Sequence, residues 1–131
     1  MSSSDESAAL RVGLLSQDLL VRSRVETGLG GHGVKLEMIT GQEPVEVFDL
    51  LLVDLNREQE KRLTWLSQAT LNQPSAGVIC FGPHTEMAKL SPRAKAAGAN
   101  SCVANSHLDQ TLQRWLRSGG GAPPRPRRAT A

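Results

Sequence analysis

Residues 48–55 of the chain read Phe-Asp-Leu-Leu-Leu-Val-Asp-Leu, and this segment constrains the fold more than any other. An apolar run without polar alternation is typical of a strand that is buried on both faces, as in a parallel sheet. Asp54 then lies at the carboxyl end of the strand, where open α/β sheets place their functional groups. The segment therefore predicts a buried parallel strand with an acidic side chain at its functional end.

Strand and helix patterns alternate along the rest of the chain. Strand-like runs occupy residues 11–16, 34–39, 49–54, 77–82 and 101–104, and helical patterns occupy residues 18–29, 57–71, 85–97 and 107–117. The first helix has an apolar stripe of Leu20, Val21, Val25 and Leu29. This alternation predicts an α/β fold of the flavodoxin-like type: a three-layer sandwich around a five-stranded parallel sheet of order 2-1-3-4-5.

Two local features refine this prediction. Ser106 and Asp109 are spaced as a capping pair for the last helix. Residues 40–48, which contain Gly41 and Pro44, are too few for a full crossover helix, which needs about 10–12 residues. We therefore expect the second helix to be shortened or missing. Either an apolar patch of the sheet is left thinly covered as a docking surface, or the neighbouring helix fills the gap.

The composition indicates one cytoplasmic domain. A chain of 131 residues allows a single domain, expected at residues 10–117, between disordered segments 1–9 and 118–131. No apolar stretch approaches the roughly 18 residues of a membrane span, and the Ser-rich, acidic N-terminus has no apolar core of a secretory signal. Cys80 and Cys102 lie inside apolar runs, so we expect buried, reduced thiols rather than a disulfide.

The net charge of +2 comes from the C-terminal tail. Removing Arg125, Arg127 and Arg128 from the 15 basic residues leaves 12 basic against 13 acidic ones. The body of the protein therefore has no electrostatic footprint for nucleic acid. The Gly-, Pro- and Arg-containing tail could bind RNA, anionic lipid or a protein, but three arginines are few and a solubilising end is favoured.

Three segments in order resemble the receiver domain of bacterial two-component response regulators. They are residues 11–22, residues 48–55, and residues 94–100, which read Ala-Lys-Ala-Ala-Gly-Ala-Asn. The resemblance implies a CheY-like fold. It also implies a site where an aspartate accepts a phosphoryl group from a histidine kinase, with Mg²⁺ held by an acidic pair. Asp54 falls on the phospho-acceptor position.

The other reactive positions depart from the family pattern. Ser16 and Gln17 stand where receivers carry the acidic pair, with Asp18 one place further on; Gly82 replaces a threonine or serine, and Asn105 replaces a lysine. Neutral oxygens are poor ligands for Mg²⁺. Each lost electrostatic partner costs on the order of 3 kcal/mol of transition-state stabilisation. We therefore expect a degenerate receiver without enzyme activity or cofactor, which acts as a signalling or adaptor module by protein contact.

Two alternatives stay open at this site. In the first, the chain is a stand-alone response regulator that is phosphorylated on Asp54, with a weakened Mg²⁺ site formed by Asp18 and Asp54. In the second, His84 pairs with Asp54 for acid–base work or metal binding. Against these, Asp18 suits a helix cap, and a histidine near a helix start is commonly an exposed turn residue.

The resemblance also implies a contact surface. In receivers, the face formed by the fourth helix, the fifth strand and the fifth helix commonly carries dimer and output contacts. The corresponding segments here are residues 85–97, 101–104 and 107–117. A homodimer or another protein partner is therefore expected at this face, with Trp115 either as an exposed anchor or packed against the sheet.

Overall fold

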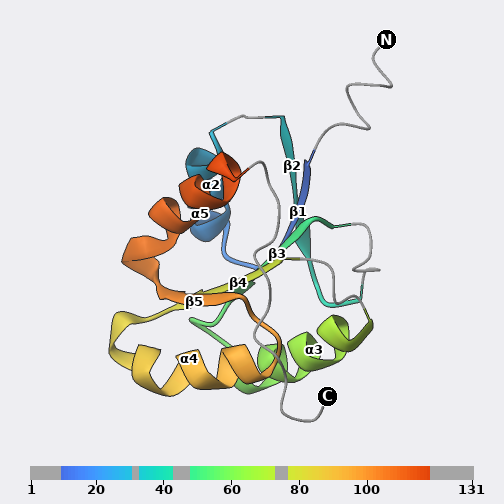
Figure 1. Ribbon diagram of the computed structural model, residues 1–131, viewed down its shortest axis with the longest axis vertical. Helices are drawn as coiled ribbons and strands as arrows, with labels where there is room; N and C mark the ends of the chain where they lie inside the picture. Colours follow the sequence, from blue (N-terminus) through green and yellow to red (C-terminus); the bar gives the residue numbers. More distant parts are fainter. Residues whose placement is uncertain (1–9, 31–32, 43–47, 73–76, 119–131) are drawn as a thin grey trace.

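The computed structural model describes residues 10–30, 33–42, 48–72 and 77–118. The strands are β1 (Leu10–Leu15), β2 (Val34–Ile39), β3 (Leu50–Asp54), β4 (Gly77–Gly82) and β5 (Ser101–Ala104). The helices are α2 (Leu19–Leu29), α3 (Gln59–Asn72), α4 (Met87–Ala96) and α5 (Leu108–Arg117), with short 3₁₀ turns at η2 (His84–Glu86) and η3 (Asn105–His107). All neighbouring strands are parallel and follow the order β2-β1-β3-β4-β5, which confirms the expected fold (Figure 1).

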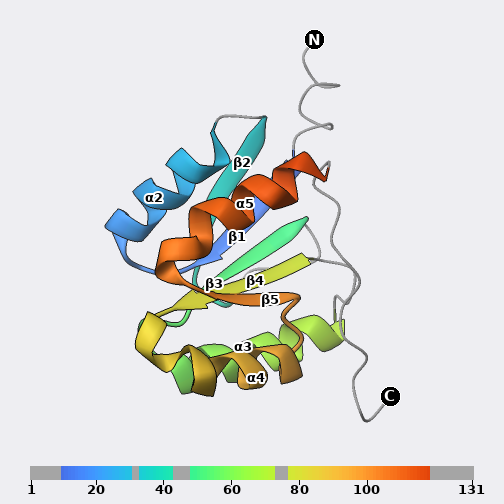
Figure 2. The ribbon, with the colours of Figure 1, turned by 60° about the vertical axis from the view of Figure 1, so that its left-hand side comes forward.

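The helices cover the sheet in two layers. Helices α2 and α5 pack side by side on one face, and α3 and α4 lie on the other (Figure 2). All residues of β3 and β4 are buried, because these central strands have helices on both sides. This is why the apolar run around Leu52 shows no polar alternation.

Helix α2 begins where the sequence predicts, but its apolar stripe is narrower than expected. The carboxylate of Asp18 caps the helix by accepting the backbone N–H of Leu20 at 2.9 Å. Val25 and Leu29 are buried against the sheet, whereas Leu20 is 82 % exposed. The assignment of Leu20 to the buried stripe is therefore wrong. Positions 21, 25 and 29 share one helix face, and position 20 lies about 100° from position 21 and about 180° from position 29 around the helix.

The connection between β2 and β3 contains no α-helix in its described residues, 40–42 and 48–49. Residues 43–47, which include Pro44, lie outside the described part of the chain. Two aromatic side chains cover the sheet near this connection. Phe48 is buried over Gly13, where an added Cβ would lie 3.2 Å from the ring. Trp65 of α3 packs on the same core and donates its indole N–H to the backbone oxygen of Gly41 at 2.8 Å. The neighbouring helix thus fills part of the gap.

The remaining surface of this face is charged rather than apolar. Arg11 on β1 donates from Nε to Glu37 on β2 at 3.2 Å, and its guanidinium lies 5.5 Å from the centre of the Phe48 ring. Lys35, two residues before Glu37 on the edge strand, is exposed. Of the two expectations for the short connection, the structure therefore supports the filled gap; an apolar docking patch is not found on the described residues of this face.

The starts of α4 and α5 differ from prediction. A 3₁₀ turn precedes each helix, and the residue that precedes α5 is His107, without a side-chain capping bond. The predicted cap by Ser106 is therefore wrong, because the extra turn moves the helix start beyond it. Asp109 instead lies 3.7 Å from Nε of Arg24, which joins α5 to α2.

The two cysteines are free thiols, as expected. Cys80 on β4 and Cys102 on β5 are register partners, and both contact the core beneath α3 and α4. Burial raises the pKa of the Cys80 thiol well above its usual value and, more weakly, that of Cys102. None of the described helices is both long and apolar enough to cross a bilayer. Of the segments predicted to be disordered, 1–9 and 118–131, only Ser118 is described; it caps the C-terminal end of α5 and donates its backbone N–H to the backbone oxygen of Arg114.

Candidate functional site

The candidate site lies where the order of the strands reverses. Strands β1 and β3 are neighbours, with Leu15 opposite Val53, but the chain leaves them toward opposite sides of the sheet. The carboxyl ends of such strands flank a crevice in open α/β sheets. Ser16 follows β1 and Asp54 ends β3, so the fold brings these two side chains together.

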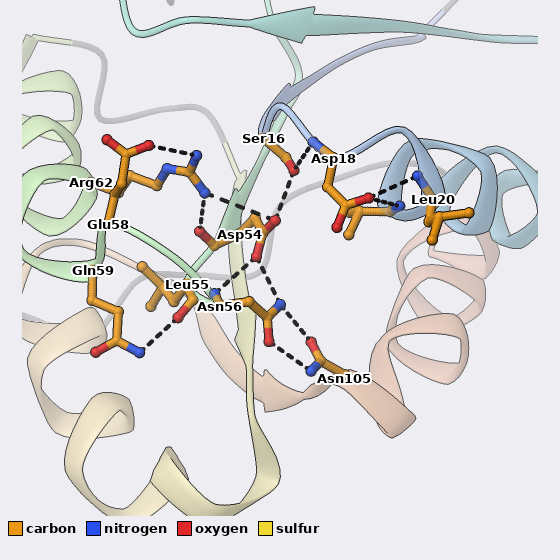
Figure 3. Close-up of polar contacts among 11 residues, drawn as sticks. Ser16, Asp18, Leu20, Asp54, Leu55, Asn56, Glu58, Gln59, Arg62 and Asn105 are labelled. Carbon is orange, nitrogen blue, oxygen red and sulfur yellow. Dashed lines mark hydrogen bonds and ion pairs between the residues drawn. The ribbon is translucent and has the colours of Figure 1, made fainter.

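The Asp54 carboxylate is buried and has partners on both of its oxygens (Figure 3). Oδ1 accepts the backbone N–H of Asn56 at 2.9 Å and the side-chain amide of Asn56 at 2.7 Å. Oδ2 accepts the hydroxyl of Ser16 at 2.7 Å. Only 2 % of the residue is exposed, so the carboxylate interacts with protein groups rather than with solvent.

A buried arginine lies beside this carboxylate. Nη1 of Arg62 lies 3.8 Å from Oδ2 of Asp54 and donates to the backbone oxygen of Asp54 at 2.7 Å. Nη2 of the same guanidinium lies 3.5 Å from the carboxylate of Glu58. Arg62 is 7 % exposed. Among the described residues, Arg62 is therefore the positive charge that pairs with the Asp54 carboxylate.

Ser16 connects Asp54 to the start of α2. Its oxygen donates to Asp54 and accepts the backbone N–H of Asp18 at 3.1 Å. The Asp18 side chain turns toward its own helix, where Oδ1 also approaches the backbone N–H of Val21 at 3.4 Å (Figure 3). Asp18 is thus a helix cap, and its carboxylate is not directed at Asp54.

Asn105 is joined to the site through a second asparagine. The amide of Asn56 donates to Oδ1 of Asn105 at 3.0 Å, and the amide of Asn105 donates to Oδ1 of Asn56 at 2.8 Å. The backbone oxygen of Asn105 accepts from Arg24 at 2.7 Å. Asn105, which stands where receivers carry a lysine, therefore forms a neutral amide pair with Asn56, and the hydrogen bond from Asn56 connects this pair to Asp54.

The other two loop residues predicted for the site do not join this network. Gly82 is buried at the end of β4, and a Cβ there would lie 3.3 Å from Leu90 and 3.4 Å from Met87. Helix α4 thus crowds the position at which receivers carry a hydroxyl. His84 is exposed at the start of η2 and makes no bond to Asp54 in the described structure.

Trp115 is not an exposed interface anchor. It is 5 % exposed and belongs to the core between the sheet and the helices α2 and α5. Its indole Nε1 is buried without a hydrogen-bond partner among the described residues. Of the two predictions for Trp115, the one that packs it against the sheet is confirmed and the exposed anchor is wrong, because the amphipathic α5 turns this residue toward the sheet.

Sequence reasoning missed Asn56, Glu58 and Arg62. A signal for Arg62 was present: Arg62, Leu66 and Thr70 recur at a spacing of four, which places the arginine on the buried face of α3. A buried arginine requires a nearby carboxylate. Asn56 stands two residues after an aspartate at a strand end, a spacing typical of an Asx turn.

Two openings adjoin the network. A cleft of about 510 Å³ has Asp54, Arg57, Arg62, Leu19 and Leu20 among its lining residues. A smaller cavity of about 210 Å³ extends from Ser16 and Arg62 to Trp65. The described residues contain no group of three or more His, Cys, Asp or Glu side chains arranged to hold a metal ion.

No protein-family model and no curated protein matches the chain. Its structure is similar to that of a CheY-like protein, tadZ, from Pseudomonas aeruginosa PAO1, with a TM-score of 0.71 and 15 % identity over 88 % of this chain and 96 % of that one. A receiver domain protein from Methanospirillum hungatei JF-1 has a TM-score of 0.69 and 18 % identity, over 85 % and 93 % of the two chains. A putative pilus assembly protein, cpaE, from Burkholderia thailandensis E264 also has a TM-score of 0.69, with 14 % identity over 85 % and 98 %. The chain therefore has the CheY-like receiver fold.

Proposed function

We propose that this chain is a non-catalytic signalling or adaptor module of receiver fold that acts by contact with another protein and is not phosphorylated on Asp54. The observation that carries the proposal is the state of the Asp54 carboxylate. Its two oxygens accept three hydrogen bonds, and the residue is 2 % exposed. A phospho-acceptor needs a free oxygen that can approach a phosphorus atom in line with the leaving group.

The groups around Asp54 do not fit the Mg²⁺ ion that the receiver fold implies. Mg²⁺ takes oxygen ligands in near-octahedral geometry at about 2.0–2.1 Å. Asp18 uses its carboxylate to cap α2, and the Ser16 hydroxyl donates a hydrogen bond to Asp54. The guanidinium of Arg62, 3.8 Å from Oδ2, would repel a divalent cation. The weakened Mg²⁺ site of the alternative reading therefore has little support from the chain's own residues.

The proposed contact is supported by apolar side chains at the rim of the site. Leu19 is 70 % and Leu20 is 82 % exposed at the start of α2, next to the cleft that contains Asp54. Adjacent, strongly exposed leucines beside a cleft are typical of interaction surfaces. Homodimerisation through α4, β5 and α5 remains a second proposal for partner contact, now without Trp115 as its anchor. A structural neighbour named as a putative pilus assembly protein supports a role for this fold in assembly as well as in signalling. We place the module in the cytoplasm.

Incubation with acetyl phosphate and Mg²⁺, followed by intact-protein mass spectrometry, tests the phosphorylation half of the proposal. The wild-type protein is expected to keep its mass. The matched control is Asp54→Asn, which cannot form an acyl phosphate at this position. A mass increase of one phosphoryl group in the wild type, absent from Asp54→Asn, would refute the proposal.

The contact half needs a separate measurement. Affinity capture from the source cells is compared between the wild type and the double variant Leu19→Ser, Leu20→Ser. Both leucines are exposed, so the double variant is expected to fold normally. A specific partner that is lost from the double variant supports contact at this rim. Equal capture by both proteins contradicts it.

A further inference from the structure

We propose that Arg62 is a built-in cation that occupies the role of a metal ion beside Asp54 and holds the site in a single state. The inference deepens the proposed function and rests on it in one respect: a site that is not phosphorylated needs no exchangeable ion. Three features of Arg62 support this role: its burial, its contacts and its anchoring in α3.

Both charges are removed from water. Asp54 is 2 % exposed and Arg62 is 7 % exposed. An isolated buried charge is strongly unfavourable, and removal of one partner from a buried pair leaves the other uncompensated. The neutral groups around Asp54, which are the Ser16 hydroxyl and the amide groups of Asn56, stabilise the carboxylate but do not neutralise it. Arg62 is the cation that does so.

The guanidinium bridges three oxygen atoms. Nη1 donates to the backbone oxygen of Asp54 at 2.7 Å and lies 3.8 Å from Oδ2, and Nη2 lies 3.5 Å from Glu58 (Figure 3). A guanidinium keeps its charge throughout the physiological pH range and presents several donors in one plane. A cation that gathers oxygens from the β3 end and the start of α3 resembles a bound metal ion in its electrostatic effect, but it cannot dissociate.

The backbone before α3 is shaped to place this cation. Glu58 has a φ of +52°, a conformation that residues other than glycine rarely adopt. The backbone oxygen of Glu58 accepts the N–H of Arg62 at 2.9 Å, so this unusual conformation lies at the first turn of the helix. It brings the half-exposed Glu58 carboxylate to the outer side of the guanidinium. Arg62 therefore has a buried carboxylate on one side and a solvent-facing one on the other.

A double-mutant cycle tests whether Arg62 and Asp54 neutralise each other. The variants are Arg62→Met, Asp54→Asn and the double variant, with folding equilibrium constants measured by urea unfolding. Arg62→Met alone is expected to lower the folding constant by roughly a hundredfold or more, because it leaves a buried carboxylate without a cation. Adding Asp54→Asn is expected to recover much of this loss. Additive losses would overturn the inference.

A matched control shows what an ordinary arginine contributes. Arg93 pairs with Glu60 between α3 and α4 at the surface. Arg93→Met and Glu60→Gln are expected to change the folding constant by less than about fivefold and to show little coupling. Coupling at the Arg93 pair as large as that at the Arg62 pair would mean that burial is not the reason, and would also overturn the inference.

The response of the thermal midpoint to Mg²⁺ distinguishes a substitute cation from an arginine with a purely structural role. Arg62→Met leaves the carboxylates of Asp54 and Glu58, which flank the guanidinium in the wild type, without their cation. The thermal midpoint of this variant is therefore expected to rise with millimolar Mg²⁺, which binds between the two carboxylates and stabilises the native state, while NaCl of equal ionic strength has less effect. The wild type and the double variant are expected to be unaffected by Mg²⁺ beyond this salt effect. If Arg62→Met does not fold, the Mg²⁺ measurement is made on Arg62→Lys instead. This variant retains the positive charge, so it is expected to fold and to show no Mg²⁺ response.

The results separate the inference from the proposed function. A wild type that binds Mg²⁺ as well as Arg62→Met does, or an Arg62→Met variant that ignores Mg²⁺, refutes the role of Arg62 as a substitute cation. An Arg62→Lys variant that folds but is stabilised by Mg²⁺ beyond the salt effect would do the same. None of these outcomes requires Asp54 to be phosphorylated. Conversely, labelling of wild-type Asp54 by acetyl phosphate refutes the proposed function even if the cycle shows strong coupling.

Discussion

Replacing Asn56 with alanine is expected to cost more stability than replacing Asn105, although the two side chains bond to each other. Asn105→Ala removes the reciprocal amide pair, with bonds of 3.0 and 2.8 Å. Asn56→Ala removes the same pair and also the 2.7 Å bond to Oδ1 of Asp54. The backbone N–H of residue 56 keeps its bond to the carboxylate in both variants. The difference between the variants therefore isolates one bond to a buried charge.

The magnitudes follow from the type of each bond. A neutral hydrogen bond contributes about 0.5–1.5 kcal/mol, so Asn105→Ala is expected to cost about 1–2 kcal/mol for a pair that is only partly buried. A bond to a charged group contributes roughly 1.5–3 kcal/mol. Asn56→Ala is therefore expected to cost about 3–4 kcal/mol. Because both variants lose the shared pair, the double variant is expected to cost about as much as Asn56→Ala alone.

Urea unfolding followed by tryptophan fluorescence measures these differences, since Trp65 and Trp115 lie on opposite faces of the sheet. The slope of the unfolding free energy against urea concentration is expected to be the same in all variants, so that differences in the unfolding midpoint report differences in stability. Equal losses for Asn56→Ala and Asn105→Ala would refute the contribution of the bond to Asp54. Additive losses in the double variant would refute the shared amide pair.

Three further predictions concern the core. Trp115→Phe is expected to change the unfolding free energy by less than about 1 kcal/mol in a thermal melt. The stability lost with the indole area is offset by the stability gained when a buried N–H without a partner among the described residues is removed. A loss of about 3 kcal/mol would contradict this. Gly13→Val is expected to destabilise by about 1–3 kcal/mol or more, and a wild-type urea midpoint would contradict the 3.2 Å approach to Phe48. In the native protein, a thiol reagent is expected to label Cys102 before Cys80. Both reactions should accelerate as the pH rises, because burial raises both thiol pKa values and only the thiolate reacts. Faster labelling of Cys80 in a Cys102→Ser variant than of Cys102 in a Cys80→Ser variant would contradict this order.

The fold could be predicted because its signals are local. Apolar runs such as Leu50–Val53 identify strands buried on both faces, and the stripe formed by Val25 and Leu29 identifies the buried face of a helix. Errors arose where one turn of backbone decides the outcome. Leu20 lies one position outside the buried stripe, and the 3₁₀ turn at Asn105–His107 moves the start of α5 past Ser106. Sequence spacing does not resolve shifts of one residue.

The site could be predicted only in part, because its main contacts join distant segments. Asp54 was identified from its place at the end of a strand, whereas Asp18 and Asn105 were identified through the resemblance to receiver domains. The contact of Arg62 with Asp54 depends on how α3 lies against β3, which the spacing of Arg62 alone does not show. The polar surface near the short connection after β2, in contrast, does have a signal in the local sequence. The alternation of Lys35 and Glu37 with apolar residues is a signal, not used in the prediction, that one face of this edge strand is polar.

The same hydrogen bonds that occupy Asp54 also determine where the exposed leucines lie. Ser16 donates to Asp54 and accepts the N–H of Asp18, and Asp18 in turn caps the first turn of α2 through Leu20. In a receiver regulated by phosphorylation, a change at the aspartate is transmitted to the surface. Under the proposed function, Arg62 and Ser16 hold the aspartate from within, and the start of α2 is expected not to respond to an external ion or phosphoryl group. A surface held in this way suits a module whose partner binding is regulated by the amount of protein or of partner, rather than by chemistry at Asp54.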